Sequence, residues 1–252
     1  MKRFLFAVIL SVSIIVNASK FTITPPKQEL VVKSGENKTF TITVDNIDDS
    51  TLHLKIYPSD WLIDSDNEIS HFPANTLKNS CSGWFYINPQ EFNIPGKSTQ
   101  EVRISMQTPN DVYGDYWSML YFESTPFASN TNQMILLNTR IGSAVYATIA
   151  GTTSKNGEII GLDFDKKEYR VKTVFENTGN VHIRVKGFMQ IFKDDKMVYE
   201  NKIEEKLSLP ESKTNIYFPI ETELQKGEYL IKVNLDYSGS EILEGEKRIT
   251  IN

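Results

Sequence analysis

The sequence has few of the residues that build disulfides and metal sites, with a single cysteine and three histidines among 252 residues. Cys81 cannot close an internal disulfide, so stability must come from packing, and we expect this thiol to be buried beside Trp84 rather than reactive. His53, His71 and His182 include no pair at the spacing of zinc ligands. We therefore predict no metal site and no cofactor.

Clusters of positive charge are also missing, and the chain has a net charge of -5. Because nucleic acid is bound through a basic surface that offsets its phosphates, we exclude nucleic acid as a partner. The short motifs of serine hydrolases, zinc proteases and phosphate-binding loops do not occur either. The sequence thus predicts a protein that is not an enzyme. A dispersed catalytic triad or a pair of carboxylates would be visible only in three dimensions.

Two patterns suggest a ligand but have a structural interpretation that we favour. Asp64, Asp66 and Glu68 resemble the start of a calcium loop, yet Ile69 and Asn75 replace the glycine and the glutamate that such a loop requires, which favours a solvated loop. Aromatic residues of the first half could form a carbohydrate platform, but strand alternation should send about half of them into the core. These aromatic residues are Trp84, Phe85, Tyr86, Tyr113, Tyr116, Trp117 and Tyr121.

A long apolar run occurs at the N-terminus, where Lys2 and Arg3 precede apolar residues 4–16 and small residues follow up to Ala18. The run is shorter than the roughly 20 residues that cross a bilayer. The pattern predicts a signal peptide over residues 1–18, cleaved after Ala18, and no membrane span. We expect the mature protein outside the cytoplasm, either periplasmic or secreted to the cell surface.

Alternation with a period of two dominates the rest of the chain and predicts antiparallel strands. Residues 40–44 and 52–56 alternate on either side of a turn, which predicts two neighbouring strands with one buried face. Further strands are predicted at 83–87, 100–106, 116–123 and 134–150, and again at seven segments after the small and polar residues 151–157. The sequence predicts an all-β fold of two tandem immunoglobulin-like sandwiches, spanning residues 19–150 and 151–252.

Three segments of the first half carry a family resemblance. Residues 87–104 include Pro89, the Pro95-Gly96 turn and a Val-Arg-Ile strand, and an aromatic strand follows at 114–122. With residues 137–142, which are similar to the last strand of that family's first domain, the first half resembles the periplasmic pilus chaperones. In the second half, the Asn-Thr-Gly-Asn turn at 177–180 with His182 is similar to sandwich modules of bacterial surface proteins, which serve adhesion or spacing.

The chaperone resemblance implies a binding mode. In that family the last strand of the first domain is a free edge along which an incomplete subunit lays its own segment. The residues implied to bind the partner strand are Gln133, Ile135, Leu137, Arg140 and Ile141. The family also holds the subunit's terminal carboxylate with two basic residues. Lys27 or Lys33 is the candidate in the first strand, and Arg140 is the nearest candidate in the last, since Gly142 stands where the second basic residue would be.

Two functions are consistent with the sequence. The first is a periplasmic chaperone-like protein that binds an extended segment of a fimbrial or surface subunit by edge-strand pairing. The alternative is a structural or adhesive cell-surface module with no chaperone activity. The expected partner is a protein subunit, with cell-envelope components as a further class. The two functions differ in whether the strand at 133–141 has an unpaired edge.

Overall fold

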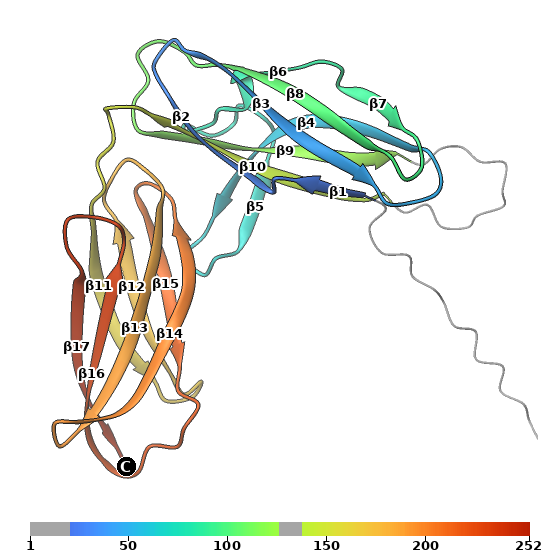
Figure 1. Ribbon diagram of the computed structural model, residues 1–252. Helices are drawn as coiled ribbons and strands as arrows, with labels where there is room; N and C mark the ends of the chain where they lie inside the picture. The colour runs from blue at the N-terminus through green and yellow to red at the C-terminus, as the bar shows by residue number, and fades with distance from the viewer. Residues whose placement is uncertain (1–20, 126–137) are drawn as a thin grey trace, which may run out of the picture.

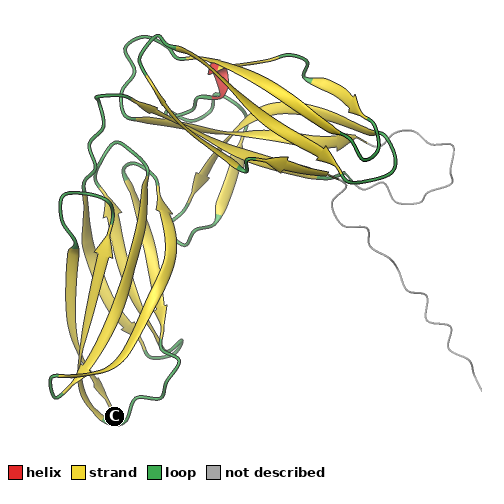
Figure 2. Ribbon diagram, in the orientation of Figure 1, coloured by secondary structure: helices red, strands yellow, loops and turns green. Residues whose placement is uncertain are grey.

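The computed structural model describes residues 21–125 and 138–252 and contains two β-sandwiches that meet at an angle (Figure 1). Helical structure in these two ranges is limited to one 3-10 turn, Ser82–Trp84 (Figure 2). The predicted all-β fold of two tandem immunoglobulin-like sandwiches is confirmed. The predicted signal peptide, residues 1–18, lies outside the described residues. No helix within the described ranges is long and apolar enough to span a membrane.

The first sandwich consists of two sheets whose apolar faces meet. One sheet contains, in order, β1 (Phe21–Thr24), β3 (Asn37–Asn46), β8 (Thr99–Gln107) and β6 (Phe85–Ile87). The other contains β2 (Lys27–Val32), β10 (Arg140–Ile149), β9 (Asp115–Thr125), β4 (Leu52–Ile63) and β5 (Ile69–Phe72), with β7 (Glu91–Ile94) also paired to β4. The core between them includes Ile42, Leu54, Ile104, Phe122 and Val145.

The alternation at 40–44 and 52–56 correctly predicts buried faces, because Ile42 and Leu54 are fully buried. The prediction that these segments are neighbouring strands is wrong. β3 pairs with β1 and β8, whereas β4 pairs with β9, β5 and β7, so the two segments face each other across the sandwich. The turn at 46–50 is therefore a crossover between sheets, which alternation alone does not distinguish from a hairpin.

The second sandwich has a smaller and a larger sheet. The smaller contains β11 (Gly157–Asp165), β12 (Arg170–Asn177) and β15 (Ser212–Pro219), and the larger contains β14 (Lys196–Ser208), β13 (Ile183–Lys193), β16 (Gly227–Asp236) and β17 (Leu243–Ile251). Phe175, Ile191, Phe218 and Ile231 are fully buried between them. β13 and β14 form a hairpin with Asp194 and Asp195 at positive φ.

Each sandwich contains a buried asparagine that fastens a crossover turn. The Nδ2 atom of Asn46 donates to the carbonyls of Ser50, Ile94 and Pro95 at 2.9, 3.1 and 3.0 Å. Asn177 donates in the same way to Val181, Ser208 and Leu209 at 2.9, 3.2 and 3.0 Å. In both turns the side-chain oxygen accepts from the main-chain N–H two residues later. One amide group thus replaces several missing strand hydrogen bonds.

The two sandwiches are joined by an apolar cluster and a polar contact. Trp61, Trp117 and Tyr146 of the first sandwich bury Leu209 of the second. Beside them the Asp115 carboxylate, which is fully buried, accepts from the main-chain N–H of His182 at 2.7 Å and also contacts the His182 ring. The His182 ring packs on Tyr146 with 4.4 Å between centroids.

Candidate functional site

Among the described residues, one edge of β10 is paired along only part of its length. β10 pairs with β9 along its length, from Arg140 opposite Glu123 to Thr148 opposite Asp115. On its other side, β2 runs parallel to it and pairs only from Ala144 onward. Within the part of the chain that the structure describes, no strand pairs with residues 140–143 on that side.

Arg140 and Gly142 direct their main-chain groups toward this open side, as the hydrogen bonds of their neighbours show. Ser124 donates its N–H to the carbonyl of Thr139 at 2.8 Å, so the odd-numbered residues of β10 bond to β9. Ala144 donates its N–H to the carbonyl of Pro26 at 3.1 Å, so the even-numbered residues face β2. The N–H and C=O groups of Arg140 and Gly142 therefore face the open edge. This row of donors and acceptors is available to an added strand.

The sequence of β2 explains why the pairing stops. In a parallel ladder, a residue that accepts from Ala144 with its carbonyl would donate its own N–H to the carbonyl of Gly142. That residue is Pro26, which has no N–H, and Pro25 before it has none either. Pro25 instead accepts a hydrogen bond from the Ser143 hydroxyl at 3.0 Å. The two prolines thus end the ladder at Ala144, a signal that sequence reasoning missed.

The side chains of the open segment point to opposite faces of the sheet. Ile141 packs partly buried against the core of the first sandwich. Arg140 is exposed on the outer face. Gly142 also faces outward, where a Cβ atom would lie 2.6 Å from the Met119 sulfur and 3.0 Å from the Tyr121 ring. The place expected for a second basic residue is therefore filled by Met119 and Tyr121.

Arg140 is held by a group of aromatic and acidic side chains. Its guanidinium lies 4.4 Å from the centre of the Tyr121 ring, and a hydrogen bond that it donates to the Tyr57 hydroxyl oxygen raises the pKa of Arg140. The Tyr57 hydroxyl also donates to Glu123, which pairs with Arg140 in the sheet register. The Tyr121 hydroxyl in turn contacts His71 at 2.8 Å. Arg140 is thus an oriented cation at one end of the open edge.

Lys27 lies at the other end of the open edge, opposite Ala144. Four positions along β10 separate it from Arg140, or about 13 Å of strand at roughly 3.3 Å per residue. The structure therefore does not bring the two predicted anchor residues together. Lys27 instead lies 3.0 Å from Glu29, which is also 2.8 Å from Arg184 of the second sandwich. Although burial alone would raise it, these cations hold the pKa of Glu29 below its ordinary value.

Arg184 was not identified from the sequence, because nothing in a β-strand pattern indicates contact with a residue 155 positions away. The remaining predicted partner-strand residues, Gln133, Ile135 and Leu137, lie outside the described residues. The predicted group at this edge is thus represented by Arg140, Ile141 and Lys27, to which the structure adds Glu29 and Arg184.

The carbohydrate platform and the metal site that were considered from the sequence are not formed by the described residues. Trp117 and Tyr121 are buried, and Trp84, Phe85 and Tyr116 pack against the core, so five of the seven aromatic residues are used in packing. In residues 21–125 and 138–252, no three or more His, Cys, Asp or Glu side chains are grouped to hold a metal ion.

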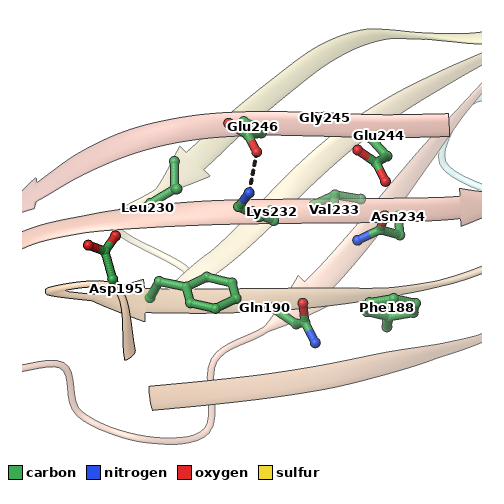
Figure 3. A pocket seen from close by; sticks show the side chains of 11 residues that line it. Phe188, Gln190, Asp195, Leu230, Lys232, Val233, Asn234, Glu244, Gly245 and Glu246 are labelled. Atoms are coloured by element: carbon green, nitrogen blue, oxygen red, sulfur yellow. Dashed lines mark ion pairs between the residues drawn. The ribbon is translucent and has the colours of Figure 1, made fainter. Parts of the chain in front are cut away.

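A shallow hollow lies elsewhere, on the outer face of the larger sheet of the second sandwich (Figure 3). Its volume is about 540 Å³, and its walls include Phe188, Gln190 and Asn234. Lys232 and Glu246, which are opposite each other on β16 and β17, also line it and form an ion pair at 2.5 Å. None of the residues of the β10 edge lines it, so it is separate from the candidate site.

Comparison with known proteins supports the fold. No protein-family model and no curated protein matches the sequence. Among solved structures, a chain of a chaperone–tip adhesin complex of CFA/I fimbriae biogenesis is similar, with a TM-score of 0.54 and 17% identity over 92% of this chain and 100% of that chain. The class 5 fimbriae chaperone CfaA has a TM-score of 0.53 and 15% identity over the same shares.

A third similar structure is the CsuC–CsuE chaperone–tip adhesion subunit pre-assembly complex from the archaic chaperone-usher Csu pili of Acinetobacter baumannii. Its TM-score is 0.51, with 12% identity over 90% of this chain and 98% of that chain. At these identities the likeness concerns the fold. The expected resemblance to the immunoglobulin-like fold of pilus chaperones is confirmed.

Proposed function

We propose that this protein is a chaperone-like protein that binds an extended segment of a fimbrial or surface subunit by adding it as a strand to β10. The observation that carries the proposal is the half-occupied edge at residues 140–143, where β2 is prevented from pairing by Pro26. An added strand would bond to the main-chain groups of Arg140 and Gly142 and extend the sheet. The apolar residues expected to fill the subunit's groove are Ile135 and Leu137, preceded by Gln133, with Ile141 at the edge of the core.

We further propose that the charged groups at the two ends of the open edge bind the terminal carboxylate of the subunit. Arg140 is exposed and oriented by Tyr121, and Lys27 lies beside Ala144. A terminal carboxylate of the subunit would meet a cation at whichever end it reaches. At the Lys27 end it would compete with Glu29 for Lys27 and Arg184. Charge-assisted hydrogen bonds of this kind contribute about 1.5–3 kcal/mol each.

The place of action follows from the same proposal. We expect cleavage after Ala18 and a periplasmic or cell-surface protein with no catalytic activity, in which the first sandwich ends at residue 150 and the second begins at 151. The partner is a protein subunit. The likeness of the fold to fimbrial chaperones is what favours this role over that of a passive surface module.

A pair of substitutions at one position tests the edge. Arg140→Pro removes the N–H that faces the open side, whereas Arg140→Ala keeps this N–H and removes only the guanidinium. With a fimbrial-type subunit of the same organism as the guest in co-expression, we expect Arg140→Pro to weaken capture by a further 2–10-fold or so relative to Arg140→Ala, since a hydrogen bond contributes about 0.5–1.5 kcal/mol. Ile135→Asp with Leu137→Asp should abolish capture.

Folding is checked in each variant by its thermal unfolding midpoint. Proline is tolerated at the edge of a sheet, and the bonds of β10 to β9 come from the odd-numbered residues, so we expect the midpoint to be nearly unchanged. Equal capture by the wild type, Arg140→Pro and the double aspartate variant would overturn the proposal.

A further inference from the structure

The hairpin formed by β4 and β5 leaves the first sandwich and contacts the second (Figure 1). Its tip, residues 64–68, lies against β15. The carbonyl of Ser65 accepts from the main-chain N–H of Asn215 at 2.7 Å. The Oδ1 atom of Asp66 accepts from the Asn215 side chain at 2.9 Å and from the Tyr217 hydroxyl at 2.7 Å. Asp66 is exposed to solvent, as expected of this loop, and in addition it bonds to the second sandwich.

The conformation of the tip is set within the first sandwich. Asp64 accepts from the main-chain N–H groups of Asp66 and Glu68, both at 2.9 Å. The Asp66 side chain is then free to point toward β15. Hydrogen bonds from Tyr217 and Asn215 hold the pKa of Asp66 below its ordinary value. The tip is therefore a preformed acceptor for two donors of the other sandwich.

This contact is separate from the junction at His182. The His182–Asp115 contact and Arg184 involve β13 and the turn before it, in the larger sheet of the second sandwich. Asn215 and Tyr217 belong to β15, in the smaller sheet. The apolar cluster of the junction already includes Trp61 of β4, and the tip of the hairpin extends the contact to the smaller sheet. An attachment to this second layer opposes rotation of one sandwich about the cluster.

We infer that the β4–β5 hairpin is a strut that fixes the angle between the two sandwiches, with Asp66 as its positioning residue. The angle determines where Arg184 lies relative to Glu29 and Lys27 at the end of the open edge. The consequence for guest binding rests on the proposed function. The consequence for the angle does not, because it concerns the free protein.

The test measures the distance between the two sandwiches by pulsed electron resonance. Spin labels are placed at Gln90→Cys, beside β7, and at Lys196→Cys, at the tip of the β13–β14 hairpin. Native Cys81 does not interfere, since it is buried with its thiol pKa raised to about 12. The strut variant is Asp66→Ala. Glu68→Ala is the matched control, because it removes a carboxylate of the same turn with no hydrogen bond from its side chain to β15 among the described residues.

We expect one narrow distance distribution for the labelled parent and for Glu68→Ala, and a broader distribution with additional distances for Asp66→Ala. Asp66→Asn keeps a carbonyl oxygen at the same place and should restore the narrow distribution, which a general loss of folding would not do. An unchanged distribution in Asp66→Ala combined with Tyr217→Phe would overturn the inference.

Guest capture separates this inference from the proposed function. If the angle becomes variable in Asp66→Ala and capture weakens about 2–10-fold, as for the loss of one or two hydrogen bonds, the strut acts on binding. If the angle becomes variable while capture is unchanged, the link to Arg184 is wrong. If the wild type captures no subunit at all, the proposed function fails while the distance measurement still decides on the strut.

Discussion

At the scale of single residues, the Asp60 carboxylate of the first sandwich accepts four hydrogen bonds. It is fully buried and accepts from the main-chain N–H groups of Thr76 and Leu77 at 2.8 and 2.9 Å. The hydroxyls of Ser80 and Ser82 donate to its other oxygen at 2.6 and 2.8 Å. One carboxylate thus anchors the irregular segment between β5 and β6.

Asp60 should make stability depend on pH in the acid range. Burial alone would raise its pKa, but the four hydrogen bonds outweigh burial and hold it below the ordinary value of 3.8. The stabilisation is therefore complete above pH 3.8 and is lost as the pH falls through the lowered pKa. In chemical denaturation, Asp60→Asn should be less stable than the wild type by about 2–4 kcal/mol at neutral pH. The difference should shrink in acid, and a constant difference would contradict this account.

Cys81 should be inert in the native protein. Its side chain is completely buried, and burial raises the pKa of its thiol to about 12. Because the thiolate is the reacting form, we expect no modification by iodoacetamide at neutral pH and full modification after unfolding in guanidinium. Mass spectrometry reports both states, and rapid labelling of the folded chain would show that the thiol is accessible.

Burial of Cys81, Ile42 and Leu54 could be predicted from the sequence because composition and alternation determine it locally. The roles of Asp60 and His182 could not. Both depend on partners that are distant in the chain, and a polar residue at a strand position looks the same whether it faces water or a second domain.

At the scale of elements, both sandwiches use an asparagine side chain to bond the carbonyls of a crossover turn. A crossover between sheets leaves carbonyls without strand partners, and such buried groups are costly when unpaired. Asn46 and Asn177 each serve three of them. The sequence shows an asparagine at the start of both turns, but the number of bonds per side chain is visible only in the structure.

Asn46→Ala and Asn177→Ala should each be destabilising by about 2–3 kcal/mol, because three buried carbonyls lose their donor. Urea denaturation measures the change. Substitution of the exposed neighbour Thr178 by alanine, as a control in the second turn, should change stability by less than about 0.5 kcal/mol. Similar losses of stability in the control and asparagine variants would show that the hydrogen bonds of the asparagine side chain contribute little.

Pro25 and Pro26 determine where a strand pairing ends, which the alternation of apolar residues does not predict. Alternation predicts that a segment is a strand, but it does not state where a ladder ends on each side. Here the missing N–H of Pro26 determines which half of β10 is open, and this follows only once the register with Ala144 is known.

At the scale of the whole molecule, the sequence predicted two sandwiches because each has its own set of alternating segments and turns. The junction could not be predicted, since Trp61, Trp117, Tyr146 and Leu209 come from four distant places in the chain. Their apolar side chains look like core residues of either sandwich. These four side chains instead form the contact between the two sandwiches.

Leu209→Ala should loosen this contact. Removing a buried leucine costs about 2–5 kcal/mol when its site cannot collapse. Since Leu209 lies between the sandwiches, we expect the variant to unfold in two calorimetric transitions, or in one markedly broader transition than the wild type. A sharp single transition that is only shifted to lower temperature would place the loss within the second sandwich.

The half-open edge of β10 has a consequence for selectivity. Main-chain donors and acceptors are the same in every polypeptide, so pairing at Arg140 and Gly142 cannot by itself tell one sequence from another. Discrimination then depends on the few side chains that flank the row. Under the proposed function we expect the protein to be promiscuous, accepting unrelated guests that share an alternating apolar pattern and rejecting those in which proline interrupts it.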